Sequence, residues 1–222
     1  MTAVTISPND SFYRLRKDPA QPSDSKEYDS PPNPGKGRLD SPGLAVMYGS
    51  QDLQICIHEC RVTAEDNLFV ATLEPSRELK LLDLTHLLDD KETEFESLDM
   101  AVHMLFLAGQ HAYPIARDIA IAAQKAGFDG LVYPSYFSLL RIGGRPFETV
   151  MGISTRRIPS LAQYERAKSI GNLAIFGHPI QNGIVSVACI NKLIMHKVEY
   201  GVHFGPVGVD PGPVAFDPEP VT

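Results

Sequence analysis

The sequence has no long hydrophobic run, and no segment approaches the ~18 consecutive apolar residues that a membrane-spanning helix requires. Its opening residues, MTAVTISPNDSFYRLRK, contain no basic region followed by an apolar block, so they do not resemble a signal peptide. We therefore expect a cytoplasmic protein with no membrane partner.

Cysteine is scarce, with 3 residues in a chain of 222. An odd number gives no disulfide framework and fits a reducing compartment. Cys56, His58 and Cys60 resemble zinc ligands, but the two cysteines fall on the apolar face of a predicted helix while His58 points elsewhere. No second ligand pair stands at zinc spacing. We expect buried structural cysteines and no metal site.

The chain also lacks an excess of positive charge. It has 20 Lys and Arg against 27 Asp and Glu, a formal net charge of −7. Because binding to nucleic acid begins with a positive surface field, nucleic acid is not an expected direct partner. A local basic pocket for an anionic small molecule remains compatible with this charge.

Common catalytic motifs are missing as well. There is no Walker A loop, no G-x-G-x-x-G after a strand, and no G-x-S-x-G around Ser135. The glycine-rich basic segments GKGR (35–38) and RIGGRP (141–146) are weak phosphate signals and are more typical of plain loops. A serine after Tyr-Pro is typical of a turn or a cap, so an acyl-transfer triad is not expected.

What the chain does contain is a mixture of strand-like and helical segments that indicates one soluble α+β domain with an appendage. A Pro-, Ser- and Asp-rich loop at 17–38 is long enough to be either functional or disordered, and a Pro-rich acidic tail ends the chain. We predict helices after residue 50, over 101–127 and over 161–170. Strands are predicted at 12–16, 44–48, 67–75, 79–84, 128–135, 148–155, 172–176, 183–190 and 192–200.

Two of these helices carry detailed predictions. In the later one, Gly127 stands where a C-terminal capping glycine belongs. One face of that helix should contain Ile115, Ile119, Ala122, Ala123 and Ala126. In the earlier one, Ser50 is the expected N-cap. Its main apolar face should contain Leu53, Cys56, Ile57 and Cys60.

Glu59 is the unusual residue of that earlier helix, because it falls on a second apolar stripe with Ile55 and Val62. An ionised carboxylate there is costly to bury unless it is paired or faces a cleft. A solvated glutamate and a functional one fit this pattern about equally well.

Five residues in order resemble a known family. Arg14 lies in FYRLR, Arg38 in GKGRLD, Tyr48 in VMYGS, Glu59 in ICIHEC and Ser135 in FDGLVYPS. This set is similar to the RES family, named for its Arg, Glu and Ser. The resemblance covers about residues 10 to 158. Because the loop after Arg14 is long, Arg16 competes with Arg14 for the place of the family's first arginine.

The resemblance implies an NAD-consuming enzyme. It implies mixed, mainly antiparallel sheets with flanking helices and a core similar to the ADP-ribosyltransferase fold. Such enzymes break the nicotinamide–ribose bond and deliver ADP-ribose to phosphate or water. NAD is then a substrate, inorganic phosphate a candidate co-substrate, and no cofactor or metal is needed. Many members are bacterial toxins held inactive by an antitoxin, which the resemblance suggests as a protein partner.

The resemblance also suggests roles for the five residues. Glu59 would stabilise positive charge on the ribose as nicotinamide leaves. Arg14 and Arg38 would bind the pyrophosphate, since arginine matches phosphate oxygens in bidentate fashion. Tyr48 would stack on the nicotinamide or hydrogen-bond through its hydroxyl. Ser135 would be a positioning hydroxyl near the ribose.

The domain boundaries and the alternatives complete the predictions. We predict a RES-type catalytic domain over 10–158 and a C-terminal extension over 159–222, packed on the same domain or used in a homodimer contact. Three alternatives stay open: an ADP-ribosyltransferase that modifies a protein, a non-catalytic nucleotide- or partner-binding module, and an α+β domain in which these residues do unrelated structural jobs.

Overall fold

The computed structural model describes residues 2–85, 98–143, 149–151, 153–155, 158 and 160–197. In this part of the chain, the main sheet has strands β1 (Ala3–Ile6), β2 (Phe12–Lys17), β3 (Val46–Ser50), β4 (Leu68–Pro75), β5 (Leu79–Asp83), β6 (Gly130–Pro134), β9 (Gly171–Phe176) and β10 (Val185–Leu193). A separate hairpin pairs β7 (Thr149–Val150) with β8 (Ile153–Ser154). The α-helices are α1 (Leu53–Glu59), α2 (Leu98–Leu107), α3 (Tyr113–Lys125), α4 (Ser138–Ile142) and α5 (Ala162–Ala167). Short 3-10 helices are η1 (Ser25–Tyr28) and η2 (Gln110–Ala112).

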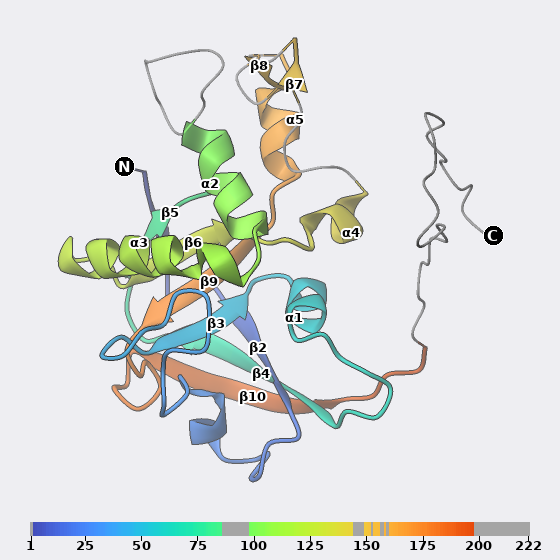
Figure 1. Cartoon of the computed structure of the whole chain (residues 1–222). Coiled ribbons are helices and arrows are strands. Elements are labelled where there is room, and N and C mark those ends of the chain that lie inside the picture. The colour runs from blue at the N-terminus through green and yellow to red at the C-terminus, as the bar shows by residue number, and fades with distance from the viewer. Residues whose placement is uncertain are drawn as a thin grey trace.

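The strands of the main sheet run in the order β1-β5-β6-β9-β3-β2-β4-β10. The pair β5–β6 is parallel, and the other described neighbours are antiparallel. The α2 and α3 helices lie together on one side of the sheet, and α1 follows the end of β3 (Figure 1). The predicted mixed, mainly antiparallel α+β fold is therefore confirmed.

Strand β9 lies in the middle of this sheet, between β6 and β3. Its side chains alternate between two cores, as the period of two in a strand requires. Leu173 and Ile175 pack in one core, whereas Ala174 and Phe176 pack in the other, with α2 and α3. Asn172 belongs by alternation to the second face. Residues beyond 160 thus form part of the central sheet.

The apolar face predicted for α1 is confirmed. Leu53, Ile57 and Cys60 pack with buried Cys56 against β2 and β4. The Cys56 thiol donates to the Tyr13 carbonyl at 3.2 Å, and burial raises its pKa. Cys56 in the helix and Cys60 at its C-cap are both packed as structural residues.

Two details of α1 were predicted wrongly. The N-cap is Asp52, whose carboxylate accepts from two backbone N–H groups, whereas Ser50 ends β3 and is buried. The helix ends at Glu59, so Val62 lies beyond it and the second apolar stripe does not continue. An aspartate two residues after the strand outcompetes the serine because only its carboxylate reaches the first free N–H groups.

The α3 helix is rotated relative to the prediction. Its buried residues are Ala116, Ala120 and Ala123, whereas Ile115 is 59% exposed. Small side chains let this helix approach the sheet closely, and the larger Ile119 packs at the margin. Gly127 adopts a φ of +82°, which confirms the predicted capping glycine.

Other segments also differ from the predictions. The long loop at 17–38, expected to be either functional or disordered, is packed, with fully buried Tyr28 in η1, so only disorder is excluded. Strand β1 was not predicted, and the short α4 helix stands where a loop was predicted. Strand β10 covers most of the predicted strand 183–190 but only the first two residues of the predicted strand 192–200, since residues 194–197 are not in a strand. The acidic segment 89–99 lies mostly outside the described residues, and the tail after 197 lies wholly outside them.

Candidate active site

Glu59 is the last residue of α1, and its side chain lines a cleft of about 600 Å³. One oxygen, Oε1, accepts hydrogen bonds from Ser135 Oγ at 2.7 Å and from Asn172 Nδ2 at 2.6 Å. The carboxylate is thus both paired and open to a cleft, which are the conditions under which a charged group is tolerated beside apolar neighbours. Cavities of this volume hold small-molecule ligands in many proteins.

The two donors to Glu59 are held rigidly. Ser135 follows β6 directly and is fully buried. Its backbone N–H donates to the Ile170 carbonyl at 2.9 Å, and its hydroxyl accepts from Phe137 N–H at 3.1 Å. Asn172 is 3% exposed and pairs with Tyr133 of β6 and Ser50 of β3 in the sheet. The donors come from the residue after β6 and from the adjacent strand β9, and they converge on one oxygen.

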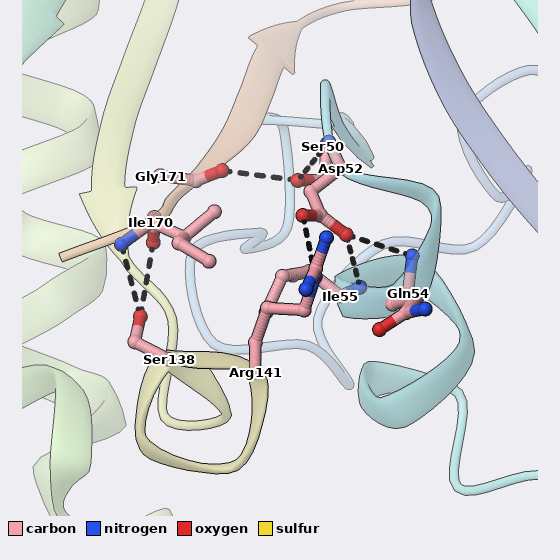
Figure 2. Close-up of polar contacts among 8 residues, drawn as sticks. All are labelled: Ser50, Asp52, Gln54, Ile55, Ser138, Arg141, Ile170 and Gly171. Carbon is pink, nitrogen blue, oxygen red and sulfur yellow. Dashed lines mark hydrogen bonds and ion pairs between the residues drawn. The ribbon is translucent and has the colours of Figure 1, made fainter. Parts of the chain in front are cut away.

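A polar network also fixes α1 against α4 (Figure 2). Asp52 Oδ1 accepts from Gln54 N–H at 2.8 Å and Ile55 N–H at 3.2 Å, and Asp52 Oδ2 accepts from Arg141 Nε at 3.0 Å. The start of the helix that ends in Glu59 is therefore tied to the short helix that follows Ser135.

The same network fixes the turn after β6 (Figure 2). Ser138 Oγ accepts from Ile170 N–H at 3.0 Å, and it donates to the Ser135 carbonyl at 2.9 Å. Ser50 Oγ donates to the Gly171 carbonyl at 3.1 Å. These bonds hold the ends of β3, β6 and β9 together, next to Glu59.

Arg14 of β2 is 6% exposed and lines the same cleft. It donates to the Tyr48 carbonyl at 2.6 Å and the Asp29 carbonyl at 3.0 Å, and its Nε has no partner among the described residues. The Asp29 carboxylate instead accepts from the backbone N–H groups of Ser30 and Gln181. Burial, with help from nearby Arg16, lowers the pKa of Arg14 to about 9, so the group still carries its charge near neutral pH. A buried guanidinium without a carboxylate partner is suited to an anionic ligand.

Arg16 lies beside Arg14 at the cleft. Its Nε donates to the Glu27 carbonyl at 2.6 Å and its Nη2 to the Asp29 carbonyl at 3.1 Å. Both arginines thus donate hydrogen bonds to backbone carbonyls of the 17–38 loop and hold that loop beside β2. Arg14 alone of the two also contacts Tyr48, and it is the more buried.

Arg38 also lines the cleft and holds the end of α2. Its Nη1 donates to the Leu105 carbonyl at 3.2 Å and its Nη2 to the Ala108 carbonyl at 3.1 Å. Its guanidinium lies 4.9 Å from the centre of the Tyr113 ring. A cation near the C-terminus of a helix interacts favourably with the helix dipole. Because Arg38 contacts carbonyls here, its positive charge is not neutralised by a carboxylate.

The Tyr48 hydroxyl is fully engaged inside the protein. It accepts from Leu39 N–H at 2.9 Å and Asp40 N–H at 3.2 Å, and it donates to Asp40 Oδ1 at 2.8 Å. Burial raises its pKa. The backbone from Gly37 to Asp40 packs tightly around this hydroxyl, since a Cβ on Gly37 would collide with Asp40 and the Tyr48 hydroxyl. This geometry leaves the ring of Tyr48, and not its hydroxyl, to contact a ligand.

The structure therefore brings Arg14, Arg38, Tyr48 and Glu59 to one cleft. Ser135 does not line the cleft but donates a hydrogen bond to Glu59. Sequence reasoning missed Asn172 and Tyr133, which also line the cleft. The available signal for Asn172 was a polar residue at the start of the apolar strand NLAIF, whereas Tyr133 looked like an ordinary core residue.

The comparisons with known proteins agree with the family resemblance. The RES domain model matches residues 11–145, which is more than half of the chain and includes all five residues of the ordered set. The chain belongs to the RES family. Asn172 lies outside the matched span.

Other comparisons add little for this RES protein. No curated protein matches its sequence. A chain of the solved M. tuberculosis MbcT–MbcA toxin–antitoxin complex aligns with 85% of this chain and 86% of its own length, at 14% identity and a TM-score of 0.48. None of the described helices is long and apolar enough to cross a membrane.

Proposed function

We propose that this RES protein binds NAD in the cleft and cleaves the bond between nicotinamide and ribose, with phosphate or water as the acceptor of ADP-ribose. The observation that carries the proposal is the placement of Glu59. Its Oε1 is held by two buried donors, and its Oε2 has no hydrogen-bond partner among the described residues. A carboxylate fixed by one oxygen offers the other to the substrate.

Departure of nicotinamide leaves positive charge on the ribose, as in glycoside hydrolysis. A fixed carboxylate beside the sugar stabilises that charge without reorganisation at the moment of reaction. Nicotinamide leaves as a neutral molecule, so its departure needs neither a metal nor a general acid.

The charge of the cleft suits the rest of NAD. Arg14, Arg16 and Arg38 all line the cleft, and no carboxylate forms an ion pair with any of the three among the described residues. The pyrophosphate, or a phosphate acceptor, would supply the missing negative charge. The rings of Tyr48, Tyr113 and Tyr136 give flat apolar surfaces for the nicotinamide or the adenine.

A biological role as the toxin of a bacterial toxin–antitoxin pair is the further part of this proposal. It is supported by membership of the RES family, many members of which have that role. Such a toxin would remove NAD from the cell until an antitoxin protein binds it. Expression of the wild-type chain should then lower cellular NAD and slow growth, whereas expression of Glu59→Gln should do neither.

The test in vitro is to incubate purified protein with NAD, with and without inorganic phosphate, and to measure nicotinamide and the ADP-ribosyl product. Glu59→Gln should lower the rate by about 10²–10³-fold, the usual cost of losing one preorganised electrostatic group. Glu65→Gln makes the same chemical change at an exposed position outside the cleft and should keep full activity. A phosphorylated product identifies phosphorolysis, and free ADP-ribose identifies hydrolysis. Equal rates for Glu59→Gln and wild type would overturn the proposal.

A further inference from the structure

The two hydrogen bonds to Glu59 end on the same oxygen. Ser135 and Asn172 both donate to Oε1, at 2.7 and 2.6 Å, while Oε2 accepts from no described residue. Two donors on one oxygen restrict rotation of the carboxylate more than one donor does. The orientation of the second oxygen, Oε2, therefore depends on both.

Asn172 is well suited to hold that oxygen. It lies on β9, hydrogen-bonded between β6 and β3, so its backbone is fixed on both sides. Its side chain is 3% exposed, and Nδ2 bonds to Glu59. A buried amide that donates to a carboxylate forms a charge-assisted bond, which is shorter and stronger than a neutral one. The Ser135 hydroxyl also donates to Glu59, and it accepts from Phe137 N–H, so both donors to Oε1 are fixed.

We propose that Asn172 is a positioning residue for Glu59 and sets which carboxylate oxygen faces the ribose, an inference that rests on the NAD cleavage proposed above. Asn172 does not contact the reacting atoms in this role and acts through Glu59. The site would thus be completed by a residue outside the family-matched span of 11–145.

The expected effect is on catalysis and not on substrate binding. Misplacement of a catalytic group by about 1 Å costs on the order of 10²-fold in rate. Asn172→Leu keeps the size of the side chain and removes the donor, so its kcat should fall about 10- to 100-fold with KM changed by less than about threefold. Asn191→Leu is the matched control, because Asn191 is exposed on β10 and lies outside the cleft. It should retain wild-type kcat.

The decisive experiment is a double-mutant cycle of Asn172→Leu with Glu59→Gln, followed by nicotinamide release from NAD. If Asn172 acts through Glu59, adding Asn172→Leu to Glu59→Gln should lower kcat by less than about twofold further, since groups that act as one unit are strongly non-additive. A merely structural role would lower kcat by the same factor in both backgrounds, and that result overturns the inference while leaving NAD cleavage intact.

A second variant guards against loss of folding. Asn172→Ser retains a small polar side chain that is too short to reach Glu59, and it replaces Asn172→Leu in the cycle if thermal unfolding shows that the leucine variant is not folded. Wild-type kcat in every folded variant at position 172 also overturns the inference. Absence of nicotinamide release from the wild-type protein overturns the proposed function, and this inference with it.

Discussion

Ser135 Oγ donates a hydrogen bond to Glu59 Oε1 at 2.7 Å, although 76 residues separate them in the chain. The bond joins the end of β6 to the end of α1. It connects two of the three residue types for which the RES family is named. The third type, arginine, is represented at the same cleft by Arg14, which donates to the Tyr48 carbonyl, and by Arg16.

Removal of the Ser135 hydroxyl should reduce catalysis. Ser135→Ala takes one of the two donors from Glu59, so kcat should fall about 10- to 100-fold while KM for NAD changes little. Steady-state nicotinamide release checks this. Ser186→Ala is the matched control, since Ser186 is exposed on β10 away from the cleft. An unchanged kcat in Ser135→Ala would contradict a positioning role for this serine.

Replacement of Arg14 by lysine should weaken NAD binding and also destabilise the fold. Lysine keeps the charge but cannot donate at once to the Tyr48 and Asp29 carbonyls. We expect KM to rise about tenfold and the free energy of unfolding to fall by about 1–3 kcal/mol, from the carbonyls left without donors. Arg77→Lys, at an exposed ion pair, should change neither by much. Wild-type KM in Arg14→Lys would remove Arg14 from the anion site.

Asp52 should contribute more to stability than its ion-pair partner. Asp52→Ala removes the N-cap of α1 and should cost about 0.5–2 kcal/mol of unfolding free energy. Arg141→Ala removes only the 3.0 Å ion pair and should cost less than about 1 kcal/mol, because Arg141 is 40% exposed. Chemical denaturation compares the two variants. A larger loss in Arg141→Ala would show that the ion pair, and not the cap, holds α1.

Asp129 should make stability depend on acid pH. Its hydrogen bond with Arg77, helped by the Lys80 backbone N–H, lowers the pKa of the Asp129 carboxyl in the folded state. The unfolded chain therefore takes up this proton first as pH falls, so the contribution is present above about pH 4 and is lost below it. Asp129→Asn should reduce stability at pH 7 by about 1 kcal/mol or less and make the loss between pH 5 and 3 shallower. The measurement is the free energy of unfolding of the wild type and of Asp129→Asn as a function of pH. The same pH dependence in both proteins would contradict this prediction.

Local sequence patterns drew attention to only part of the candidate site. Glu59 was conspicuous because a charged residue interrupted apolar stripes, whereas Ser135 looked like a turn or cap residue and became a candidate only through the family resemblance. Their contact could not be predicted, since it depends on how β6, β9 and α1 meet. Asn172 was missed for the same reason, because a strand pattern says which face a residue takes but not what lies opposite.

The rest of the fold shows a similar division. Strands such as β2, β4 and β6 were predicted nearly to their ends, because each combines apolar runs with clear turn residues. The rotation of α3 was not predicted, since an alanine face and an isoleucine face look equally suitable until the distance from helix to sheet is known. Strand order is a property of the whole chain, and β9 enters the centre of the sheet from far along the sequence.

Release of nicotinamide from NAD by the purified wild-type protein, compared with Glu59→Gln under the same conditions, tests the central claim most directly. The account predicts many turnovers by the wild type and a rate at least about 100-fold lower for Glu59→Gln, with both proteins folded. No release by the wild type, with phosphate and water both present and NAD shown to bind, would contradict it.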